Sequence, residues 1–358
     1  MSAARHIVVV GAGIVGASIA WHLARAGARV TVVAAGGAGG IATPATFAWI
    51  NASWGNPQPY FRLRSRSMRE WVRLAAELPP VGLSWCGGLC WDMPRADLEA
   101  YAAQYGAWGY DIRLVDGAEA LQIEPALAAP PTLAAYVASE GVVEPRAAVS
   151  ALLGDAVGRG AVLHADLAVH RLAATGGHVT GIETDAGTIA ADDVVLAAGI
   201  AVPALAATAG VEVAITTPPG LLVHSKPHPR LLNGVVLAEA AHLRQTAEGR
   251  IVAGADFTGT DPGADPGATA RALFDRAKAM LRGADDLELD HFTIGLRPTP
   301  FDGFPIVGRP RQVQGLYVAV MHSGVTLAAA VGAFAAEELL AGRRDPLIEP
   351  YGHGRAPL

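Results

Sequence analysis

Two short runs of β-branched residues near the N-terminus enclose an alanine-rich apolar segment. Val8-Val9-Val10 leads into the glycine-rich run 11–16, the alanine-rich segment covers 14–26, and the second β-branched run covers 29–33. Short apolar runs rich in valine indicate buried strands, whereas a longer apolar segment rich in alanine indicates a helix. The pattern therefore predicts a strand, a tight glycine turn, a helix and a second strand.

The glycine turn reads Gly-x-Gly-x-x-Gly, and its flanking elements are those that a dinucleotide-binding site requires. Gly11 permits the tight turn, Gly13 lets the backbone approach a pyrophosphate, and Gly16 allows the helix to pack closely on the strand. The helix N-terminus offers free N–H groups and partial positive charge to the phosphates. An acidic residue usually holds the ribose about 20 residues later, but 34–37 reads Ala-Ala-Gly-Gly. We therefore expect backbone groups or water to hold the ribose.

Strand patterns dominate the chain from residue 220 onward. The strands predicted there are 221–224, 235–238, 242–245, 250–254 and 289–296. Earlier in the chain, 58–78 is typical of an amphipathic helix with arginines off its apolar face, and 192–199 of a buried strand that ends in a glycine turn. Near the C-terminus, 325–341 is apolar on almost every face, which predicts a buried helix whose N-terminus Ser323 caps.

The composition limits the classes of protein to which the chain can belong. A length of 358 residues predicts two domains, and 51% hydrophobic with 17% charged residues is typical of a compact fold. The net charge of −6, without a basic cluster, argues against nucleic acid or an anionic membrane as a partner. The apolar stretch 7–20 resembles a signal peptide in length, but its three glycines belong to the nucleotide motif. We therefore expect a soluble, cytoplasmic protein without a membrane span. The composition is compatible with a monomer or an oligomer.

The two cysteines of the chain are Cys86 and Cys90. Four residues apart on one predicted strand, they would share a face and lie too far apart for an unstrained disulfide. No second pair of Cys or His stands at ligand spacing. We therefore expect two packed thiols and no metal site.

Four motifs stand far apart in the chain. They are Gly11-x-Gly13-x-x-Gly16; Val194-Val195-Leu196-Ala197-Ala198-Gly199; Gly295-Leu296-Arg297-Pro298 with Asp302-Gly303-x-Pro305-x-x-Gly308; and His322-Ser323-Gly324-Val325-Thr326-Leu327. Together they resemble the D-amino-acid oxidase superfamily, with the glycine oxidase and sarcosine oxidase branches nearest. The motifs occur in the family's order and span the chain, whereas 56–138 matches loosely.

The resemblance implies an α/β fold with two domains. One is a discontinuous Rossmann-like FAD-binding domain, and the other is an α+β substrate domain with a mostly antiparallel sheet that covers the flavin. We assign 1–50, 140–205 and 293–358 to the FAD-binding domain. We assign 51–139 and 206–292 to the substrate-binding domain.

Members of this family oxidise a C–N bond of an amine or amino acid. Commonly a hydride passes from the carbon next to nitrogen to flavin N5, the imine hydrolyses, and oxygen or another acceptor reoxidises the flavin. The resemblance implies an FAD-dependent oxidase of a small primary or secondary amino acid or amine that forms H2O2. Three alternatives stay open: a dehydrogenase of the same fold with another electron acceptor, an NAD(P)-dependent reductase, and a flavoprotein without turnover.

The resemblance also assigns roles to single residues. Arg297 stands where glycine and D-amino-acid oxidases place the arginine that binds the substrate carboxylate, and its planar fork suits that role; the alternative is a structural arginine. His242 takes the position of a pocket tyrosine, where it would bond the substrate, help to deprotonate its ammonium, or only line the pocket. His322 is the third candidate catalytic residue, and Trp49 and Asn51 would line the substrate pocket.

A larger set of residues is expected to contact the FAD. It consists of Gly11, Gly13, Ile14, Val15, Gly16, Ala34, Gly40, Thr43, Thr46, Phe47, Ala48, Val169, Ala198, Gly199, Arg297, Ser323, Gly324, Val325 and Thr326. Within this set, Val169 falls where a backbone contact to adenine is made. The segment 322–326 should lie along the flavin pyrimidine edge, where the helix N-terminus would stabilise the anionic reduced flavin.

Two departures from the family pattern change what is expected. Gly295 stands where some sarcosine-oxidase-like enzymes carry the cysteine that links the flavin, so the FAD should be noncovalent. The strand 249–254 contains no lysine where that branch uses one to activate oxygen, and the chain's lysines are Lys226 and Lys278. Fast reaction with oxygen is therefore not assumed.

Overall fold

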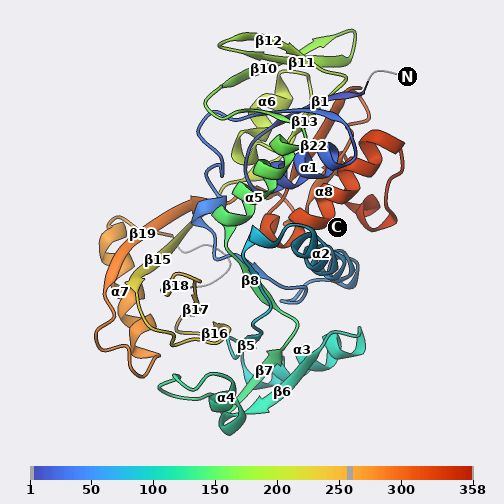
Figure 1. Cartoon of the computed structure of the whole chain (residues 1–358). Helices are drawn as coiled ribbons and strands as arrows, with labels where there is room; N and C mark the ends of the chain where they lie inside the picture. Colours follow the sequence, from blue (N-terminus) through green and yellow to red (C-terminus); the bar gives the residue numbers. More distant parts are fainter. Residues whose placement is uncertain (1–3, 256–260, 357–358) are drawn as a thin grey trace.

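The structure, a computed structural model, describes residues 4–255 and 261–356. Residues 1–3, 256–260 and 357–358, which the predicted domain ranges include, lie outside the described residues. Most strands gather into two sheets that lie in opposite halves of the molecule (Figure 1). The α-helices are α1 (Ile14–Arg25), α2 (Gln58–Glu77), α3 (Arg95–Ala107), α4 (Gly117–Ile123), α5 (Pro145–Gly158), α6 (Val202–Ala207), α7 (Pro266–Ala279) and α8 (Gly324–Ala341).

The first sheet has six strands in the order β21-β22-β13-β1-β2-β9. They are β1 (His6–Val10), β2 (Arg29–Val33), β9 (Val162–His164), β13 (Asp193–Leu196), β21 (Ile306–Gly308) and β22 (Leu316–Val320). The strands from β22 to β9 run parallel, and β21 is antiparallel to β22. The central strands are valine-rich because both of their faces are buried. This is the Rossmann-like sheet that the glycine turn predicts.

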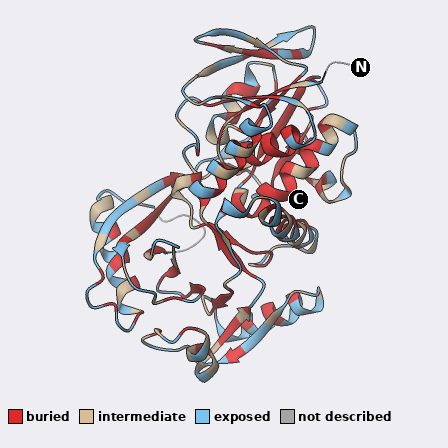
Figure 2. Cartoon of the chain, viewed as in Figure 1, coloured by how far each residue is buried: buried red, intermediate tan, exposed pale blue. Residues whose placement is uncertain are grey.

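The two faces of this sheet are covered by different elements. Ile7 and Val9 of β1 belong to one core with α1, α5 and α8. Val8 and Val10 belong to another with α6 and a small sheet of β10 (Val169–Thr175), β11 (His178–Thr184) and β12 (Gly187–Ala190). Successive side chains of a strand point to opposite faces, so β1 contributes to both cores. In Figure 2 the central strands of this sheet and much of α1 and α8 are correspondingly coloured as buried.

The second sheet has eight strands in the order β19-β15-β18-β17-β16-β5-β7-β6. They are β5 (Gly88–Cys90), β6 (Ile112–Asp116), β7 (Leu133–Val137), β15 (Pro219–Pro227), β16 (Val235–Leu237), β17 (His242–Gln245), β18 (Arg250–Gly254) and β19 (Leu289–Leu296). All neighbours are antiparallel except β16 with β5. Leu243 and Ala253 pack with residues of α7, so the alternating residue His242 lies on the face away from α7.

Short strands complete the fold. They are β3 (Trp49–Ile50), β4 (Leu83–Ser84) and β8 (Gly141–Val143) in one small sheet; β10 (Val169–Thr175), β11 (His178–Thr184) and β12 (Gly187–Ala190) in another; and the pair β14 (Ile215–Thr216) with β20 (Thr299–Pro300). The strand β8 passes between the two halves in Figure 1. Trp49 of β3 packs with Val142 of β8 and with Cys90, Val235 and Leu237 of the second sheet. The sheet β3-β8-β4 therefore joins the two halves.

The helix α8 lies at the centre of the first core. Among the described residues, it is the helix that is long and apolar enough to cross a membrane by length and composition, and 61% of it is buried inside the fold. It packs on α1 and α2, and Gly342 ends it in the left-handed conformation, with φ +67°. Its apolar faces therefore have protein neighbours, as the sequence pattern predicts.

Three local predictions are wrong. Cys86 precedes β5 and is separated from it by Gly87 (φ +80°), so the two cysteines do not share one strand. Ser323 is the N-cap of α8 but makes no capping hydrogen bond, because its Oγ accepts one from Arg64 instead. Arg64 itself is buried, although the arginines of this helix were expected off its apolar face. The division into two domains stays a prediction.

We expect Gly16→Ala to destabilise the protein by about 1–3 kcal/mol. A Cβ at this position would clash with the carbonyl oxygen of Gly11, where the helix approaches the turn most closely. Gly154→Ala in α5 is the matched control, because nothing lies within 4 Å of a Cβ there and alanine favours a helix. Urea unfolding followed by circular dichroism measures both variants. Equal stability of the two variants would show that the turn and helix are not tightly packed.

Candidate active site

The glycine turn and the loop that follows β2 form the first part of the site. Gly13 is the N-cap of α1 and offers no capping side chain. Ile14 N donates to Thr43 Oγ1 (3.1 Å), and Gly40 (φ +63°) packs against the backbone of Gly13. This leaves a helix N-terminus lined by glycines and one hydroxyl, which is a suitable environment for a pyrophosphate.

Three parallel strands, β1, β13 and β22, end at the same edge of the sheet, next to that turn. Gly11 (φ +111°) approaches β13 so closely that a Cβ on it would clash with the Ala197 carbonyl. Ala198 and Gly199 (φ +56°) follow one residue after the end of β13. Because ligands of open parallel sheets bind at the carboxyl ends of the strands, this edge is the expected place for the cofactor.

The N-termini of α1 and α8 lie against each other at this edge. A Cβ at Gly324 would lie 3.4 Å from Val15 Cγ2, which is ordinary contact distance. The carbonyl of Val325 accepts a hydrogen bond from Trp71 Nε1 (3.0 Å), and so does the carbonyl of Thr326 (3.1 Å). The predicted contact residues of both helices are thus brought together.

Two residues predicted at the adenosine end have clear backbone roles. Ala34 N donates to the His164 carbonyl, and the Ala34 carbonyl accepts from Leu167 N, each at 2.9 Å. Both backbone groups of Ala34 therefore have protein partners, and its carbonyl oxygen can accept a second hydrogen bond. Val169 is half-buried at the start of β10 and pairs with Thr184.

The guanidinium of Arg297 lies beside Gly220 of β15. A Cβ at Gly220 would lie 2.5 Å from Arg297 Nη2 and 2.8 Å from its Nε, so the glycine leaves the space that the guanidinium occupies. Gly295 is also tight, because a Cβ there would lie 2.9 Å from the Ala45 carbonyl oxygen. A cysteine at 295 would require the chain around Ala45 to move.

His322 follows β22 and carries no charge at neutral pH. Burial, followed by the positive charges of Arg297 and Arg64, lowers the pKa of His322 to about 4. The neutral ring can still donate or accept a hydrogen bond. The positive charges of two guanidinium groups therefore act on the segment that leads into α8.

Arg64 of α2 connects two of the predicted site residues. Its Nε donates to the Asn51 carbonyl (3.0 Å), and its Nη2 donates to Asn51 Oδ1 (2.7 Å). Its Nη1 donates to Ser323 Oγ (2.5 Å). Arg64 is 6% exposed and Asn51 is 3% exposed. One buried guanidinium thus fixes the chain after β3 to the N-terminus of α8.

Trp49 is held from both ends. Its carbonyl accepts a hydrogen bond from Thr326 Oγ1 (3.2 Å), and its Nε1 donates to Glu140 Oε2 (3.0 Å). Glu140 also accepts from Ser53 Oγ (3.1 Å) and the Tyr110 hydroxyl (2.6 Å). Burial raises the pKa of Glu140 to about 7, although these three donors oppose the shift.

The chain that leads into β3 is strained. Ala48 adopts a left-handed φ of +60°, and its N–H donates to Thr46 Oγ1 (3.3 Å). Phe47 packs against the hydrophobic cluster that contains Trp49. Trp54, just after this segment, has φ +77°, and among the described residues these two are the non-glycine residues with positive φ. Such conformations persist where the surroundings hold them, and they cluster at functional sites.

His242 lies at the far end of an aromatic row. Its Nε2 is 2.7 Å from Asp92 Oδ2, and its side chain is 2% exposed. Its ring meets Trp54 edge-on, with centroids 6.0 Å apart, and Trp54 meets Trp49 in the same way at 6.0 Å. Trp54 therefore connects His242 to the predicted pocket residue Trp49.

The structure gathers the predicted residues into two groups. Arg297, His322, Ser323 and Asn51 lie around the N-terminus of α8 with Arg64, and Trp49 and His242 lie along the aromatic row. Sequence reasoning missed Arg64, Asp92, Glu140 and Trp54. Only Arg64 carries a signal, because it falls three residues after Phe61 and four before Met68 and so lies on the helix's apolar stripe.

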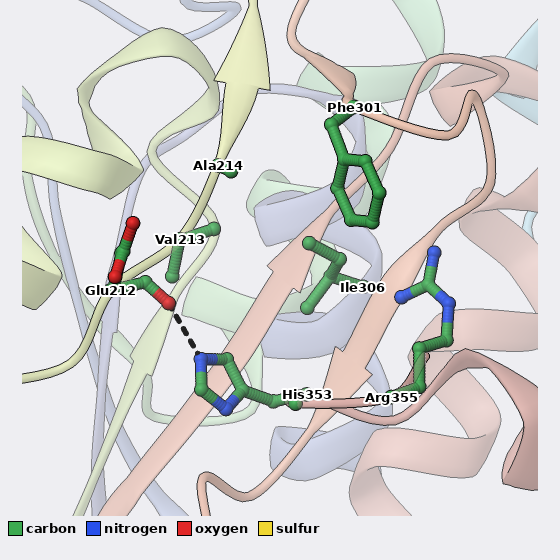
Figure 3. Close-up of a pocket in the computed structure, with 8 residues that line it drawn as sticks. Glu212, Val213, Ala214, Phe301, Ile306, His353 and Arg355 are labelled. Carbon is green, nitrogen blue, oxygen red and sulfur yellow. Dashed lines mark hydrogen bonds between the residues drawn. The ribbon is translucent and has the colours of Figure 1, made fainter. Parts of the chain in front are cut away.

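A hollow of about 160 Å³ lies elsewhere on the described surface (Figure 3). Residues 212–214, 301, 306 and 353–355 line it, and none of them is a predicted site residue. His353 Nε2 bonds to the Glu212 carbonyl across it (2.8 Å). This contact fastens the C-terminal segment to the chain before β14.

Comparisons with known proteins agree with this arrangement. The sequence profile of the family of FAD dependent oxidoreductases, DAO, matches residues 6–338. The glycine oxidase of Bacillus licheniformis is 27% identical, over 93% of this chain and 92% of its own length. The solved structure of glycine oxidase from Geobacillus kaustophilus has a TM-score of 0.87 and 25% identity, over 98% of this chain and 99% of that one. L-proline dehydrogenase from P. horikoshii has the same TM-score and identity, over 97% of each chain.

The chain belongs to the family of FAD-dependent oxidoreductases, DAO. It is thus an enzyme that uses FAD, which confirms the predicted cofactor and the α/β fold class. The alternative of an NAD(P)-dependent reductase is thereby set aside.

Glu140 should make the stability of the fold depend on pH. The pKa of Glu140 rises on folding from 4.5 to about 7, so the folded protein holds this proton more tightly than the unfolded chain does. The resulting stabilisation is complete below pH 4.5 and is lost as the pH rises through 7. A shift of this size is equivalent to about 3 kcal/mol.

Glu140→Gln cannot ionise and is the reference for this measurement. Relative to it, the wild-type enzyme should lose about 3 kcal/mol of unfolding free energy between roughly pH 4 and pH 8. Urea unfolding of both proteins at the two pH values measures the loss. A difference between them that does not change with pH would refute the assignment.

Proposed function

We propose that this enzyme oxidises the C–N bond of a small primary or secondary amino acid. The observation that carries the proposal is the guanidinium of Arg297, which fills the space beside Gly220. Its charge also adds to the effect of burial in lowering the pKa of His322. A planar guanidinium binds a carboxylate through two parallel hydrogen bonds. The names of its relatives, glycine oxidase and L-proline dehydrogenase, support an amino acid as the substrate.

The bound FAD supplies the two-electron acceptor for this oxidation. The residues at the N-terminus of α1 would hold its pyrophosphate, and 322–326 would lie at the pyrimidine edge of its ring. Support for this placement comes from Gly13, which leaves the end of α1 without a capping side chain, and from Gly324, where α8 contacts α1. The tight surroundings of Gly295 support noncovalent binding.

The chain's own residues then bind and orient the substrate. Arg297 would hold the substrate carboxylate. Neutral His322 would offer a hydrogen bond but would not compete with Arg297 as a second cation for that carboxylate. Asp92 fixes the ring of His242 through Nε2. We assign His242 to the pocket wall, where it would meet the amino end of the substrate together with Trp49 and Trp54.

A second candidate, a dehydrogenase that passes electrons to an acceptor other than oxygen, is favoured by the positions of the lysines. Lys226 pairs with Glu288 at the surface, and Lys278 donates to the carbonyls of Asp285 and Leu287. Neither lies on β18, where the sarcosine oxidase branch uses a lysine to activate oxygen. Oxygen consumption with formation of H2O2 would identify the oxidase, whereas turnover with a dye or quinone alone would identify the dehydrogenase.

Arg297→Leu should raise the KM for an amino acid by the equivalent of about 2–4 kcal/mol, because the substrate carboxylate loses its charged partner. This corresponds to roughly 30- to 900-fold. The matched control substrate is the amine of the same length without the carboxyl group, whose KM should stay within about threefold in the variant. Steady-state kinetics with both substrates decide the matter. Unchanged KM for the amino acid would exclude Arg297 as the carboxylate ligand.

A further inference from the structure

Arg64 is a buried cation whose hydrogen bonds go to neutral groups. Among the described residues, its donors reach two oxygens of Asn51 and the hydroxyl of Ser323, and no carboxylate lies within ion-pair distance. Its guanidinium also lies over the Tyr60 ring, 5.4 Å from the centroid. A buried charge normally has a partner of opposite sign, because removing it from water is otherwise costly.

The carboxyl group of Glu140 compensates this charge incompletely. Arg64 is close enough to lower the pKa of Glu140, but burial dominates and holds that pKa at about 7. Glu140 also directs its oxygens to Trp49, Ser53 and Tyr110 rather than to the guanidinium. Near neutral pH this carboxyl group is therefore not a full counter-charge for Arg64.

The uncompensated positive charge of Arg64 lies at the N-terminus of α8. Arg64 bonds directly to Ser323, the N-cap residue of that helix. The helix itself adds partial positive charge at the same end. Burial, followed by the charges of Arg297 and Arg64, lowers the pKa of His322, which directly precedes Ser323.

We propose that Arg64 is a positioning and charge-supplying residue for an anionic ring bound at the N-terminus of α8. It holds Asn51 and Ser323 in place, and its charge is balanced when the FAD bound there is reduced. This inference rests on the placement of the flavin ring proposed above. It adds to that placement a residue from α2, which sequence reasoning assigned to the surface of the helix.

The test compares sulfite binding to the purified holoenzyme and to variants, followed by flavin absorbance. Sulfite adds to oxidised flavin and leaves negative charge on the ring, so its affinity reports nearby positive charge. Arg64→Gln keeps an amide that can donate but removes the charge, and should raise the sulfite dissociation constant at least about tenfold. Arg64→Lys keeps the charge and should change it less than about threefold.

Arg62→Gln is the matched control, because Arg62 is an exposed arginine of the same helix. It should bind sulfite as the wild-type enzyme does. Equal losses in Arg64→Gln and Arg64→Lys would mean that the fork only supports the structure, and no loss in Arg64→Gln would mean that its charge is irrelevant. Either result overturns the inference. Should Arg64→Gln fail to accumulate with FAD, Arg64→Lys decides alone, since loss of sulfite affinity there would overturn it too.

The inference and the proposed function fail in distinguishable ways. If no amino acid is oxidised while sulfite binding depends on the charge at residue 64, the proposed substrate is wrong and Arg64 keeps its role. If amino acids are oxidised and sulfite binding does not depend on the charge at residue 64, the proposed substrate class stands and the inference about Arg64 is wrong.

Discussion

The position of the N-terminus of α8 is the constraint on which the rest of the structure depends. The helix is fixed from one side by Ser18 Oγ, which donates to the Ala328 carbonyl (2.7 Å). From another side, Ser67 Oγ of α2 donates to the Thr326 carbonyl (2.6 Å). Gly332 has no side chain because a Cβ there would clash with Ser18. With α8 held in this way, its first turn lies at the carboxyl edge of the parallel sheet, next to the glycine turn.

The segment 48–54 connects the N-terminus of α8 to the second sheet. At one end Thr326 binds the Trp49 carbonyl, and at the other Trp54 packs on His242. Both ends of the segment carry residues with positive φ, a cost that the buried hydrogen bonds of Glu140 and Arg64 help to offset. The carboxyl edge of the parallel sheet and the second sheet are therefore connected through this short stretch of chain, whose strand β3 belongs to the sheet β3-β8-β4 that joins the two halves.

Much of the fold could be predicted from local patterns in the sequence. The glycine turn, the strands 242–245, 250–254 and 289–296, and the buried C-terminal helix all follow from periodicity and turn chemistry, and the structure contains each of them. Arg297 was identified by its motif, but the reason that it fits is Gly220, which is 77 residues away in sequence (297 − 220). That relation depends on strand register, which the sequence pattern does not determine.

The residues that sequence reasoning missed share a physical cause. Glu140 and Asp92 are carboxylates in irregular segments between strands and helices, where solvent exposure is the usual expectation. Only tertiary contacts bury the first and bring the second to His242. Ser323 was expected to cap α8, which is the usual role of serine at that position, but the competing donor comes from Arg64, 259 residues away. Local rules fail here at the residues that surround the candidate site, where long-range polar contacts replace them.

The central claim is that a cationic side chain beside the flavin binds the carboxylate of an amino acid substrate. Its most direct test is anaerobic mixing of the holoenzyme with small amino acids, N-alkyl glycines and the corresponding amines that lack a carboxyl group. Flavin absorbance follows the reaction without any assumption about the electron acceptor. We expect at least one carboxylate-bearing amine to bleach the flavin and its decarboxylated counterpart to do so far more slowly. Equal bleaching by both, or by neither across the whole series, would contradict the central claim.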